Sequence, residues 1–286
     1  MKIISNELVK LHPGNEIESP ARVKIEEIVN VDVDLALAEI EIRKTYTSRS
    51  YNFDTIKAMC SFGMHVAEVE LNNDSLNSVL ASVSVGIQAL DNEDFALIRP
   101  PGHHANLEGA RGFCLINNLA VILRESIEQG KKIAIIDFDG HHGDGTHDIF
   151  KNNSQVLFCS LFQGGAYPFV TDSDMHNNKN GLYIPLREGG DDRVFKQTMD
   201  IFIDKIRSFG PDIVAVSAGF DAYKDDPILG LKFTEDGYTY AGKLIRDIGV
   251  KTFAILEGGY HKKIGSCISA FVDGFNNPQQ EIGEFH

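Results

Sequence analysis

Residues 132–144 read KIAIIDFDGHHGD, and this stretch carries the pattern that decides the fold. Its first half is a short apolar run rich in isoleucine, which is typical of a strand covered on both faces in a parallel sheet. Its second half changes at once to aspartate, histidine and glycine. A buried strand that leads directly into polar residues predicts a ligand site at the carboxyl end of such a sheet.

Similar apolar runs recur along the chain and alternate with segments of helical periodicity. The further runs are Phe95–Ile98, Gln155–Leu161, Leu182–Leu186, Asp212–Ser217 and Lys251–Leu256. The helical segments are Ser75–Leu90, Leu115–Gln129, Arg193–Phe209 and Thr234–Ile248, of which the second ends at Gly130 and the third at Gly210-Pro211. This alternation predicts βαβ units and a three-layer α/β/α sandwich with a mostly parallel central sheet. Residues 1–90 are harder to interpret, and we expect at most one strand there.

The composition predicts a single domain over residues 1–286. The chain is 43% hydrophobic, and it has no internal repeat and no linker of low complexity. Its formal net charge of −14 argues against a nucleic-acid groove, which needs clustered basic residues. No apolar run approaches the roughly 18 residues of a membrane span, and the N-terminus lacks a secretion signal. The four scattered cysteines form no CxxC pair and favour a reducing, cytoplasmic setting.

Five of the strand-like runs lead into polar or glycine-rich residues. These residues are Arg99–His104, Asp137–Asp144, Ser160, Ala218–Asp221 and Glu257–Tyr260. Because the carboxyl ends of parallel strands meet at one edge of a sheet, we expect these groups to form a single site.

Three of these side chains have the chemistry of a metal site. Asp139 and His141 are two residues apart, so in an extended segment both point the same way and can meet one cation. Asp221, from another strand end, would complete a set of one histidine and two aspartates. Zinc accepts these ligands and keeps an open position when it is catalytic.

The loop after Ile98 contains two adjacent histidines. Pro100, Pro101 and Gly102 define a tight loop that can present His103 and His104 to one cavity. Hydrolysis of an amide needs a base for water and an acid for the leaving amine, and histidine serves both roles near neutral pH. Asp137 and Asp144 are suited to orient the two imidazole rings.

Tyr260 follows Gly258 and Gly259. A glycine pair lets the backbone approach a ligand closely, and it can direct the phenol toward a reacting oxygen. A neutral donor at that place would stabilise a tetrahedral oxyanion. The remaining histidines His65, His147, His176 and His261 have no partner pattern, and we expect them to be structural or surface residues.

Taken together, these motifs resemble the zinc-dependent histone deacetylase family, which includes the acetylpolyamine amidohydrolases and shares its fold with arginase. The matching strings are RPPGHHA at 99–105, GFCLINN at 112–118, DFDGHHGDGT at 137–146, SAGFDAYKDDPILG at 217–230 and LEGGY at 256–260. A weaker match, HPGNEIESPAR, covers residues 12–22. Five motifs in the family's order make the resemblance specific.

The resemblance implies a role for each matching residue. Asp139, His141 and Asp221 would bind one zinc ion, and Tyr260 would polarise the acyl carbonyl. His104 would be the general base and acid, held by Asp144, and His103 would stabilise charge, held by Asp137. Phe113 and Tyr167 would form tunnel walls, and the carbonyl of Gly112 would accept the scissile amide N–H. Arg22 would lie beside the acetate exit. A K⁺ or Na⁺ ion would be bound by Asp137, Asp139 and Ser160 with main-chain oxygens of His141 and Leu161.

The resemblance also frames the substrate, which would be an acylated lysine on a protein or peptide, or a small acylated amine. Phe162 stands where many relatives carry histidine, so the rim is altered. Ile228 stands where polyamine-directed members carry an acidic residue, which disfavours a cationic polyamine tail. For the residue that grips the substrate backbone, Glu70 and Asp74 are the candidates.

Two other functions remain open at this point. A two-metal ureohydrolase of the arginase type would need a second carboxylate close to Asp221, and position 223 is tyrosine. A catalytically silent module that binds acyl-lysine or a small carboxylate is the other alternative. The intact set of His103, His104 and Tyr260 argues against it.

Overall fold

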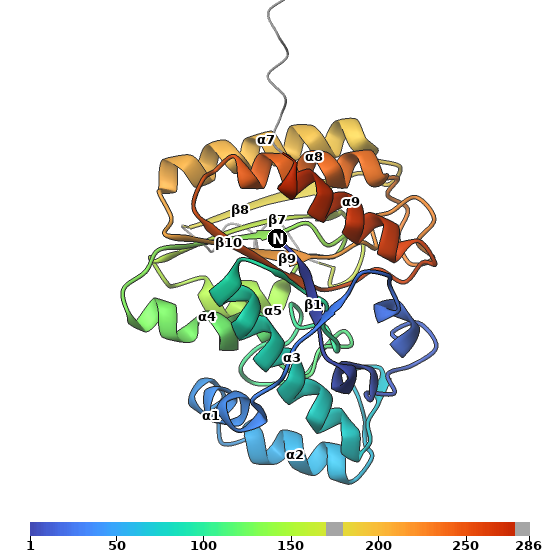
Figure 1. Cartoon of the computed structure of the whole chain (residues 1–286), viewed down its shortest axis with the longest axis vertical. Coiled ribbons are helices and arrows are strands. Elements are labelled where there is room, and N and C mark those ends of the chain that lie inside the picture. The colour runs from blue at the N-terminus through green and yellow to red at the C-terminus, as the bar shows by residue number, and fades with distance from the viewer. Residues whose placement is uncertain (170–179, 278–286) are drawn as a thin grey trace, which may run out of the picture.

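The computed structural model describes residues 1–169 and 180–277, and its centre is an eight-stranded parallel sheet (Figure 1). The strand order is β2-β1-β5-β10-β9-β6-β7-β8, and every pairing in this sheet is parallel. The strands are β1 (Ile3–Ser5), β2 (Val29–Asn30), β5 (Phe95–Ala96), β6 (Ile133–Asp137), β7 (Val156–Gln163), β8 (Gly181–Leu186), β9 (Ile213–Ala218) and β10 (Lys251–Leu256).

Helices cover both faces of the sheet. Helices α7, α8 and α9 form one outer layer, and α3, α4 and α5 lie on the opposite face, with α1 and α2 beyond α3 (Figure 1). Their bounds are α1 (Leu35–Thr45), α2 (Phe53–Ser61), α3 (Asn73–Asn92), α4 (Asn118–Glu128), α5 (Asp144–Phe150), α7 (Asp192–Phe209), α8 (Glu235–Arg246) and α9 (Ile264–Asn276), with short 3₁₀ helices η1 (Glu7–Lys10) and η2 (Pro20–Val23). The predicted three-layer α/β/α sandwich is confirmed.

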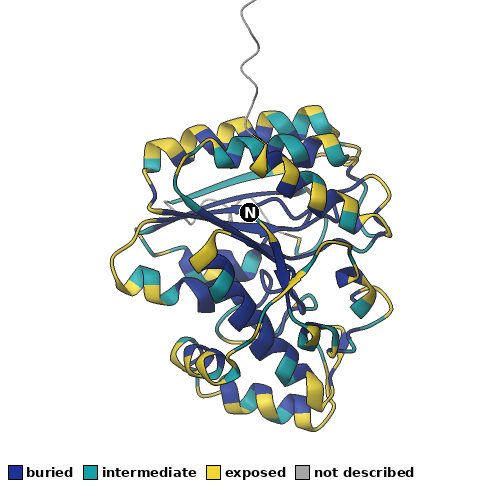
Figure 2. Ribbon diagram, in the orientation of Figure 1, coloured by how far each residue is buried: buried dark blue, intermediate teal, exposed yellow. Residues whose placement is uncertain are grey.

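Strand β6 explains why residues 133–136 are apolar at every position. Its successive side chains point to opposite faces. Ile133 and Ile135 pack in the core on the α3–α4 side, whereas Ala134 and Ile136 pack in the core under α7, α8 and α9. In Figure 2 the central strands of the sheet are buried, whereas the edge strands β8 and β2 are intermediate or exposed, and the outer helices alternate between buried and exposed residues.

The elements after residue 90 agree closely with the sequence prediction. All six predicted strands exist, and helix α7 ends at Gly210, whose φ of 66° lies in the left-handed region. Helix α4 begins three residues later than predicted because Asn117 caps it by accepting a hydrogen bond from the Ala120 amide. Strand β5 is shorter than predicted and covers only Phe95–Ala96.

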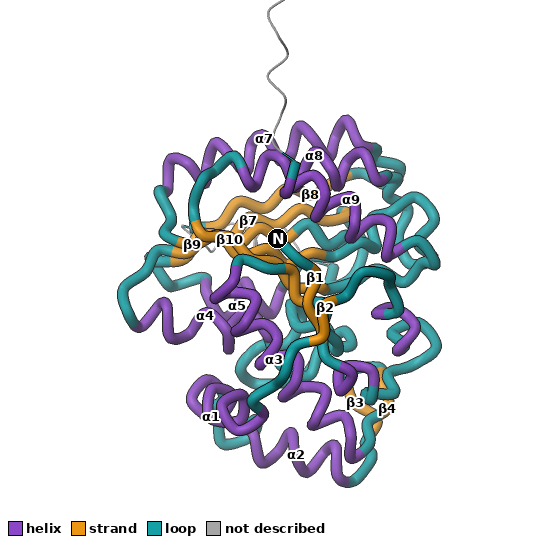
Figure 3. Tube along the Cα trace, in the orientation of Figure 1, coloured by secondary structure: helices purple, strands orange, loops and turns teal. Residues whose placement is uncertain are grey.

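The prediction for residues 1–90 was wrong. The central sheet takes two strands from this region, β1 and β2, and a separate hairpin pairs β3 (His65–Val66) with β4 (Val69–Glu70), as Figure 3 shows. Strands of two or three residues contain too few positions to show a period of two. Their pairing depends on partners that are distant in the sequence.

Across the described parts of the chain, no helix combines the length and apolar character that a membrane crossing requires. All four cysteines are buried and free.

Candidate active site

The candidate site lies where the loops after four adjacent strands meet. Strands β5, β10, β9 and β6 are neighbours in the sheet and run in the same direction, so their carboxyl ends share one edge. The loop after β5 holds the two histidines, and the loop after β6 holds Asp139 and His141. The loops after β9 and β10 hold Asp221 and Tyr260.

Asp139, His141 and Asp221 converge on one point. Each offers one ligand atom, and these three atoms lie within 4.8 Å of one another in buried surroundings. The Nδ1 atom of His141 is 3.2 Å from a carboxylate oxygen of Asp139 and 2.6 Å from one of Asp221. Two buried carboxylates and an imidazole at this spacing form a group that could bind a metal ion.

The glycine pair after β10 has a specific role at this group. The Gly258 amide donates to Asp139 Oδ2 over 2.8 Å. A Cβ atom at Gly258 would lie 2.5 Å from that oxygen and 2.7 Å from Asp221 Oδ2. Only glycine lets the backbone pass so close to both carboxylates, because any side chain would collide with them.

The two histidines lie beside the Asp-His-Asp group, and each is oriented by one aspartate. His103 Nδ1 is 3.0 Å from Asp137 Oδ2, and His104 Nδ1 is 2.7 Å from Asp144 Oδ1. The two ring centres are 4.1 Å apart. The structure therefore pairs each imidazole with the carboxylate predicted for it.

The two imidazoles have opposite electrostatic settings. Burial and then the charge of the neighbouring His103 together lower the pKa of His104 to about 4, against the effect of Asp144. Burial also opposes charge on His103, but the carboxylates of Asp139 and Asp137 outweigh it and raise its pKa well above the ordinary value. A neutral His104 beside a cationic His103 suits one ring to accept a proton and the other to stabilise negative charge.

Tyr260 is held by contacts with its backbone and its ring. Its amide donates to Asp226 Oδ2 over 2.8 Å, and the same carboxylate accepts from the Ile228 amide over 2.9 Å. The guanidinium of Arg22 lies 4.5 Å from the centre of the Tyr260 ring. Burial raises the pKa of the Tyr260 phenol well above its usual value, so the phenol stays a proton donor.

A small pocket of about 260 Å³ opens over these residues. Its wall consists of Glu68, His104, Gly112, Phe113, His141, Tyr167, Ile228 and Tyr260. All four residues predicted to contact substrate are among them. The Phe113 and Tyr260 rings stand nearly perpendicular, with centres 5.7 Å apart, and the Tyr167 ring lies 4.9 Å from that of His104.

The carboxylate at the pocket wall is one that sequence reasoning missed. Glu68 lies in the tight turn of the β3–β4 hairpin, and the amide of Phe113 donates to the carbonyl of Ala67 in the same turn over 2.9 Å. Glu70, a candidate from the sequence, instead pairs with His65 on the surface, and Asp74 lies in the first turn of α3. The hairpin, which the sequence did not indicate, decides which acidic residue reaches the pocket.

Glu257 is the second residue without a predicted role. It is buried, and its Oε2 accepts hydrogen bonds from the amides of Gly102 and His103 over 2.7 and 3.1 Å. Ser217 Oγ donates to its other oxygen over 2.9 Å. Its position within LEGGY was the available signal, because a charged residue at the end of an apolar strand needs a buried partner.

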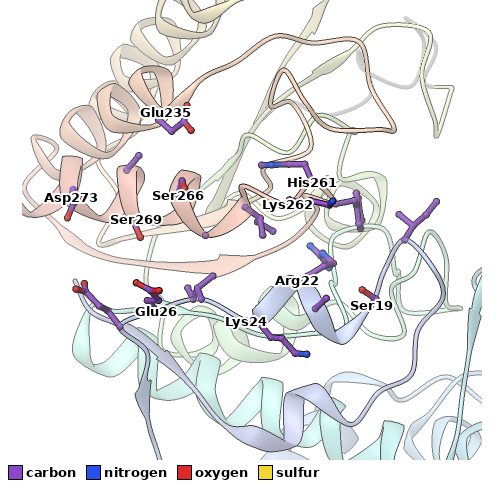
Figure 4. Close-up of a pocket in the computed structure, with 18 of the residues that line it drawn as sticks. Ser19, Arg22, Lys24, Glu26, Glu235, His261, Lys262, Ser266, Ser269 and Asp273 are labelled. Carbon is purple, nitrogen blue, oxygen red and sulfur yellow. The ribbon is translucent and has the colours of Figure 1, made fainter.

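A larger groove of about 1020 Å³ lies on the other side of Tyr260, between η2 and helices α8 and α9 (Figure 4). Tyr260 and Arg22 line it together with His261. Arg22, which the resemblance implies to lie beside the acetate exit, thus lines an open groove in this structure.

Other predicted polar residues lie farther from the pocket. Ser160 pairs with Asp137 in the β6–β7 register, and its Oγ is 3.0 Å from His142 Nδ1. Among the remaining histidines, His65 lies on the surface, His147 stacks on Tyr183, and His261 is buried against the Phe220 carbonyl. His176 lies outside the described residues.

Comparison with known proteins gives the family. The model of the histone deacetylase domain matches residues 23–275, which is most of the chain. The chain belongs to the histone deacetylase domain family. The family predicted from the motifs is confirmed, and the prediction of a deacetylase-type hydrolase agrees with this membership.

Individual relatives of this histone deacetylase family member come from archaea, bacteria and plants. An uncharacterized protein of Methanocaldococcus jannaschii is 34% identical over 80% of this chain and 71% of its own length. Histone deacetylase 10, chloroplastic, of Oryza sativa is 39% identical over 63% and 43% of the two chains. Acetylpolyamine amidohydrolase of Mycoplana ramosa is 32% identical over 72% and 64%. The chain thus spans about two fifths to seven tenths of the length of these relatives.

Solved structures show the same fold. The HD domain of HDA15 superposes with a TM-score of 0.85 at 27% identity, covering 96% of this chain and 87% of that one. Acetylpolyamine aminohydrolase from Burkholderia pseudomallei superposes with a TM-score of 0.81 at 23% identity, over 96% and 98% of the chains. The arginase-deacetylase-like fold predicted from the motifs is therefore confirmed.

Proposed function

We propose that this member of the histone deacetylase family is a zinc-dependent amide hydrolase that removes an acyl group, in particular acetyl, from an acylated amine. One observation carries the proposal. Around a single small pocket lie a buried Asp-His-Asp group, an imidazole pair with its two carboxylates, and a phenol. Each group is one that amide hydrolysis requires.

The donor set fits zinc. Asp139, His141 and Asp221 supply two oxygens and one nitrogen, the ligand types of catalytic zinc, and their closeness leaves two buried carboxylates in need of a cation. When bound, zinc would supply a Lewis acid that polarises the acyl carbonyl and makes water more acidic.

The imidazole pair would move the proton. His104 faces the pocket and is neutral, so it can take a proton from the attacking water and later give it to the leaving amine. Asp144 holds the ring through Nδ1, which leaves Nε2 as the atom that exchanges the proton. His103 would carry positive charge beside it, paired with Asp137.

Tyr260 would stabilise the oxyanion. Its phenol keeps its proton and lies at the wall of the pocket, so it can donate to the acyl oxygen as negative charge develops there. The carbonyl of Gly112 would accept the scissile amide N–H. Phe113 and Tyr167 would enclose an apolar stem such as that of lysine.

We propose an acylated lysine of a protein or peptide as the substrate class, with an acylated polyamine as the alternative. Ile228 makes part of the wall apolar and favours the lysine stem. Glu68 is the specific observation in favour of the alternative, because a carboxylate at this pocket could bind a cationic amine.

Two further parts of the proposal concern a monovalent cation and the cellular compartment. Asp137, Asp139 and Ser160, with main-chain oxygens of His141 and Leu161, would bind K⁺ or Na⁺. Four free, buried cysteines favour a reducing compartment, and we propose the cytoplasm.

The test is a deacylation screen of the purified, zinc-loaded protein. Acyl-lysine peptides, acylated polyamines and small acylamines would be compared over several acyl lengths, with bound metal counted by elemental analysis. We expect one zinc per chain and turnover of at least one class. Zinc-loaded protein without any turnover would support the silent binding module, and two manganese ions per chain would support a ureohydrolase.

Asp221→Ala tests the metal group itself. Removing one of three ligands should abolish both zinc binding and turnover, because two donors no longer enclose the ion. The matched control is Asp225→Ala, which changes an exposed aspartate on the same loop. A variant that loses Asp221 but keeps zinc and activity would contradict the proposed ligand set.

A further inference from the structure

A buried carboxylate in the N-terminal segment binds two arginines at once. Glu18 is fully buried, and its Oε1 accepts from Arg99 Nε over 2.8 Å and from Arg22 Nη1 over 3.0 Å. Its Oε2 accepts from Arg99 Nη2 over 2.5 Å. Neither arginine is exposed to solvent, and Glu18 is the carboxylate that forms an ion pair with both.

One arm of this bridge reaches the loop of the two histidines. Arg99 directly precedes the Pro100–His104 segment. Besides Glu18, Arg99 donates to the carbonyl of His12 over 2.7 Å, and its own carbonyl accepts from Ser82 Oγ over 2.8 Å. The start of the histidine loop is therefore anchored to the N-terminal segment.

The other arm reaches the loop of Tyr260. Arg22 Nε donates to the Gly259 carbonyl over 2.7 Å, and Arg22 Nη2 donates to the Glu257 carbonyl. The same guanidinium lies against the Tyr260 ring, at 4.5 Å from its centre. Figure 4 shows Arg22 at the inner wall of the large groove, beside the segment that contains His261.

Glu18 thus connects the two loops that hold the groups of the proposed chemistry: Arg99 contacts the start of the histidine loop, and Arg22 contacts the Tyr260 loop. Glu257 already joins these loops from one side by accepting from the amides of Gly102 and His103. Glu18 joins them a second time, through Arg99 and Arg22. Without the shared carboxylate, the two buried guanidinium groups would repel one another. Loss of the Glu18 charge should therefore move at least one of them.

We propose that Glu18 is a positioning residue, which keeps Tyr260 and the His103–His104 pair in their relative places by binding Arg22 and Arg99 together. The inference rests on the proposed hydrolase function. Glu18 itself does not line the substrate pocket, so its effect on turnover would pass through Arg22, Arg99 and the loops that they hold. Small displacements of reacting groups are enough for a large effect on rate.

The experiment compares Glu18→Gln with Glu16→Gln, an exposed glutamate in the same segment. In Glu18→Gln we expect kcat to fall by about 10- to 100-fold, with KM within about twofold and unchanged zinc content. Glu16→Gln should match the wild-type protein. Equal kcat in the two variants would overturn the inference.

A double variant separates positioning from general damage. If Glu18 acts through Tyr260, adding Glu18→Gln to Tyr260→Phe should cost much less than it costs in the wild-type background. Fully additive losses would overturn the role through Tyr260. Should Glu18→Gln not fold, Arg22→Lys serves instead, since it keeps the charge but replaces the three separate nitrogens of the guanidinium, which contact Glu18 and two carbonyls, with a single ammonium group. Arg22→Lys with wild-type kcat would equally overturn the inference.

A measurement without turnover distinguishes this inference from the proposed function. With ¹³Cζ-labelled tyrosine, the NMR signal of Tyr260 is assigned by its loss in Tyr260→Phe. We expect that signal to shift in Glu18→Gln and to stay in place in Glu16→Gln. A shifted signal in a protein that hydrolyses no acylated amine would support the positioning role and contradict the proposed function. An unshifted signal would overturn the positioning role.

Discussion

At the scale of single residues, most of the buried polar groups at the site have hydrogen-bond partners, and the Tyr167 hydroxyl is an exception. His103 and His104 each have one aspartate, Asp139 accepts the Gly258 amide, and Glu257 accepts two amides and a hydroxyl. Burying polar groups costs free energy unless they are hydrogen-bonded, so this pairing is a condition for the fold as well as for chemistry.

Tyr260→Phe tests the oxyanion role at this scale. The change removes one donor and leaves the ring, so zinc should remain bound while turnover falls by about 10²-fold or more. Elemental analysis and steady-state kinetics on an acyl-lysine peptide would measure both. Tyr240→Phe, on the exposed side of α8, is the control. Full activity in Tyr260→Phe would remove the phenol from the mechanism.

His12 gives a prediction for stability against pH. Burial lowers the pKa of His12 to about 4, compared with 6.5 for an unperturbed histidine, so the unfolded chain binds its proton more readily. Between pH 6.5 and 4 the free energy of unfolding should therefore fall as the pH falls, by up to about 3 kcal/mol from this residue.

Urea unfolding at several pH values would measure this dependence. His12→Asn should lower stability near neutral pH but flatten the dependence between pH 6.5 and 4. His65→Asn is the exposed control. An unchanged slope in His12→Asn would show that other groups cause the dependence.

At the scale of elements, the β3–β4 hairpin brings Glu68 to the pocket, although its turn residues are unfavourable for the turn conformation. Ala67 and Glu68 occupy its two turn positions with φ of 53° and 64°, where glycine and asparagine are preferred. The turn is held from outside, because Phe113 donates to Ala67 and Asn15 Nδ2 donates to the Glu68 carbonyl over 2.8 Å. Backbone strain of this kind persists where surrounding contacts enforce it.

Glu68→Asn should therefore stabilise the protein. Asparagine tolerates the left-handed conformation better, and relief of about 1 kcal/mol should raise the melting temperature by roughly 2–4 °C for a chain of this size. Glu70→Asn, in the adjacent strand, should give no such rise. A lower melting temperature in Glu68→Asn would indicate that the carboxylate itself contributes to stability.

At the scale of the whole molecule, the candidate metal group connects distant parts of the chain. Its ligands come from the loops after β6 and β9, and Gly258 from the loop after β10 contacts one of them directly. Binding of an ion to these residues would stabilise the folded state, because the unfolded chain offers no such arrangement.

Removal of metal with a chelator should accordingly lower the melting temperature. At a zinc concentration 100 times the dissociation constant, the loss is about 2.7 kcal/mol, or roughly 5–10 °C. One equivalent of zinc should restore it, and Asp221→Ala should show no dependence on the chelator. Calorimetry would measure each case, and a chelator-insensitive wild-type protein would contradict the proposed metal group.

The sequence by itself determined the layers of the fold and the main site residues. Apolar runs such as 132–138 predict buried strands because burial on both faces is a local property of each position. Their polar ends then identify Asp139, His141, Asp221 and the histidine pair, since parallel strands bring these ends to one edge.

Only the tertiary structure decided the parts that depend on contacts between distant segments. The short strands of residues 1–90 pair with partners that no local period reveals, and the hairpin selects Glu68 over Glu70 as the carboxylate of the pocket. Glu18 meets Arg99 across 81 positions, and Arg22 meets Gly259 across 237. Such contacts are set by the packing of the whole chain, because the free energy that pairs buried charges depends on where the fold brings them together.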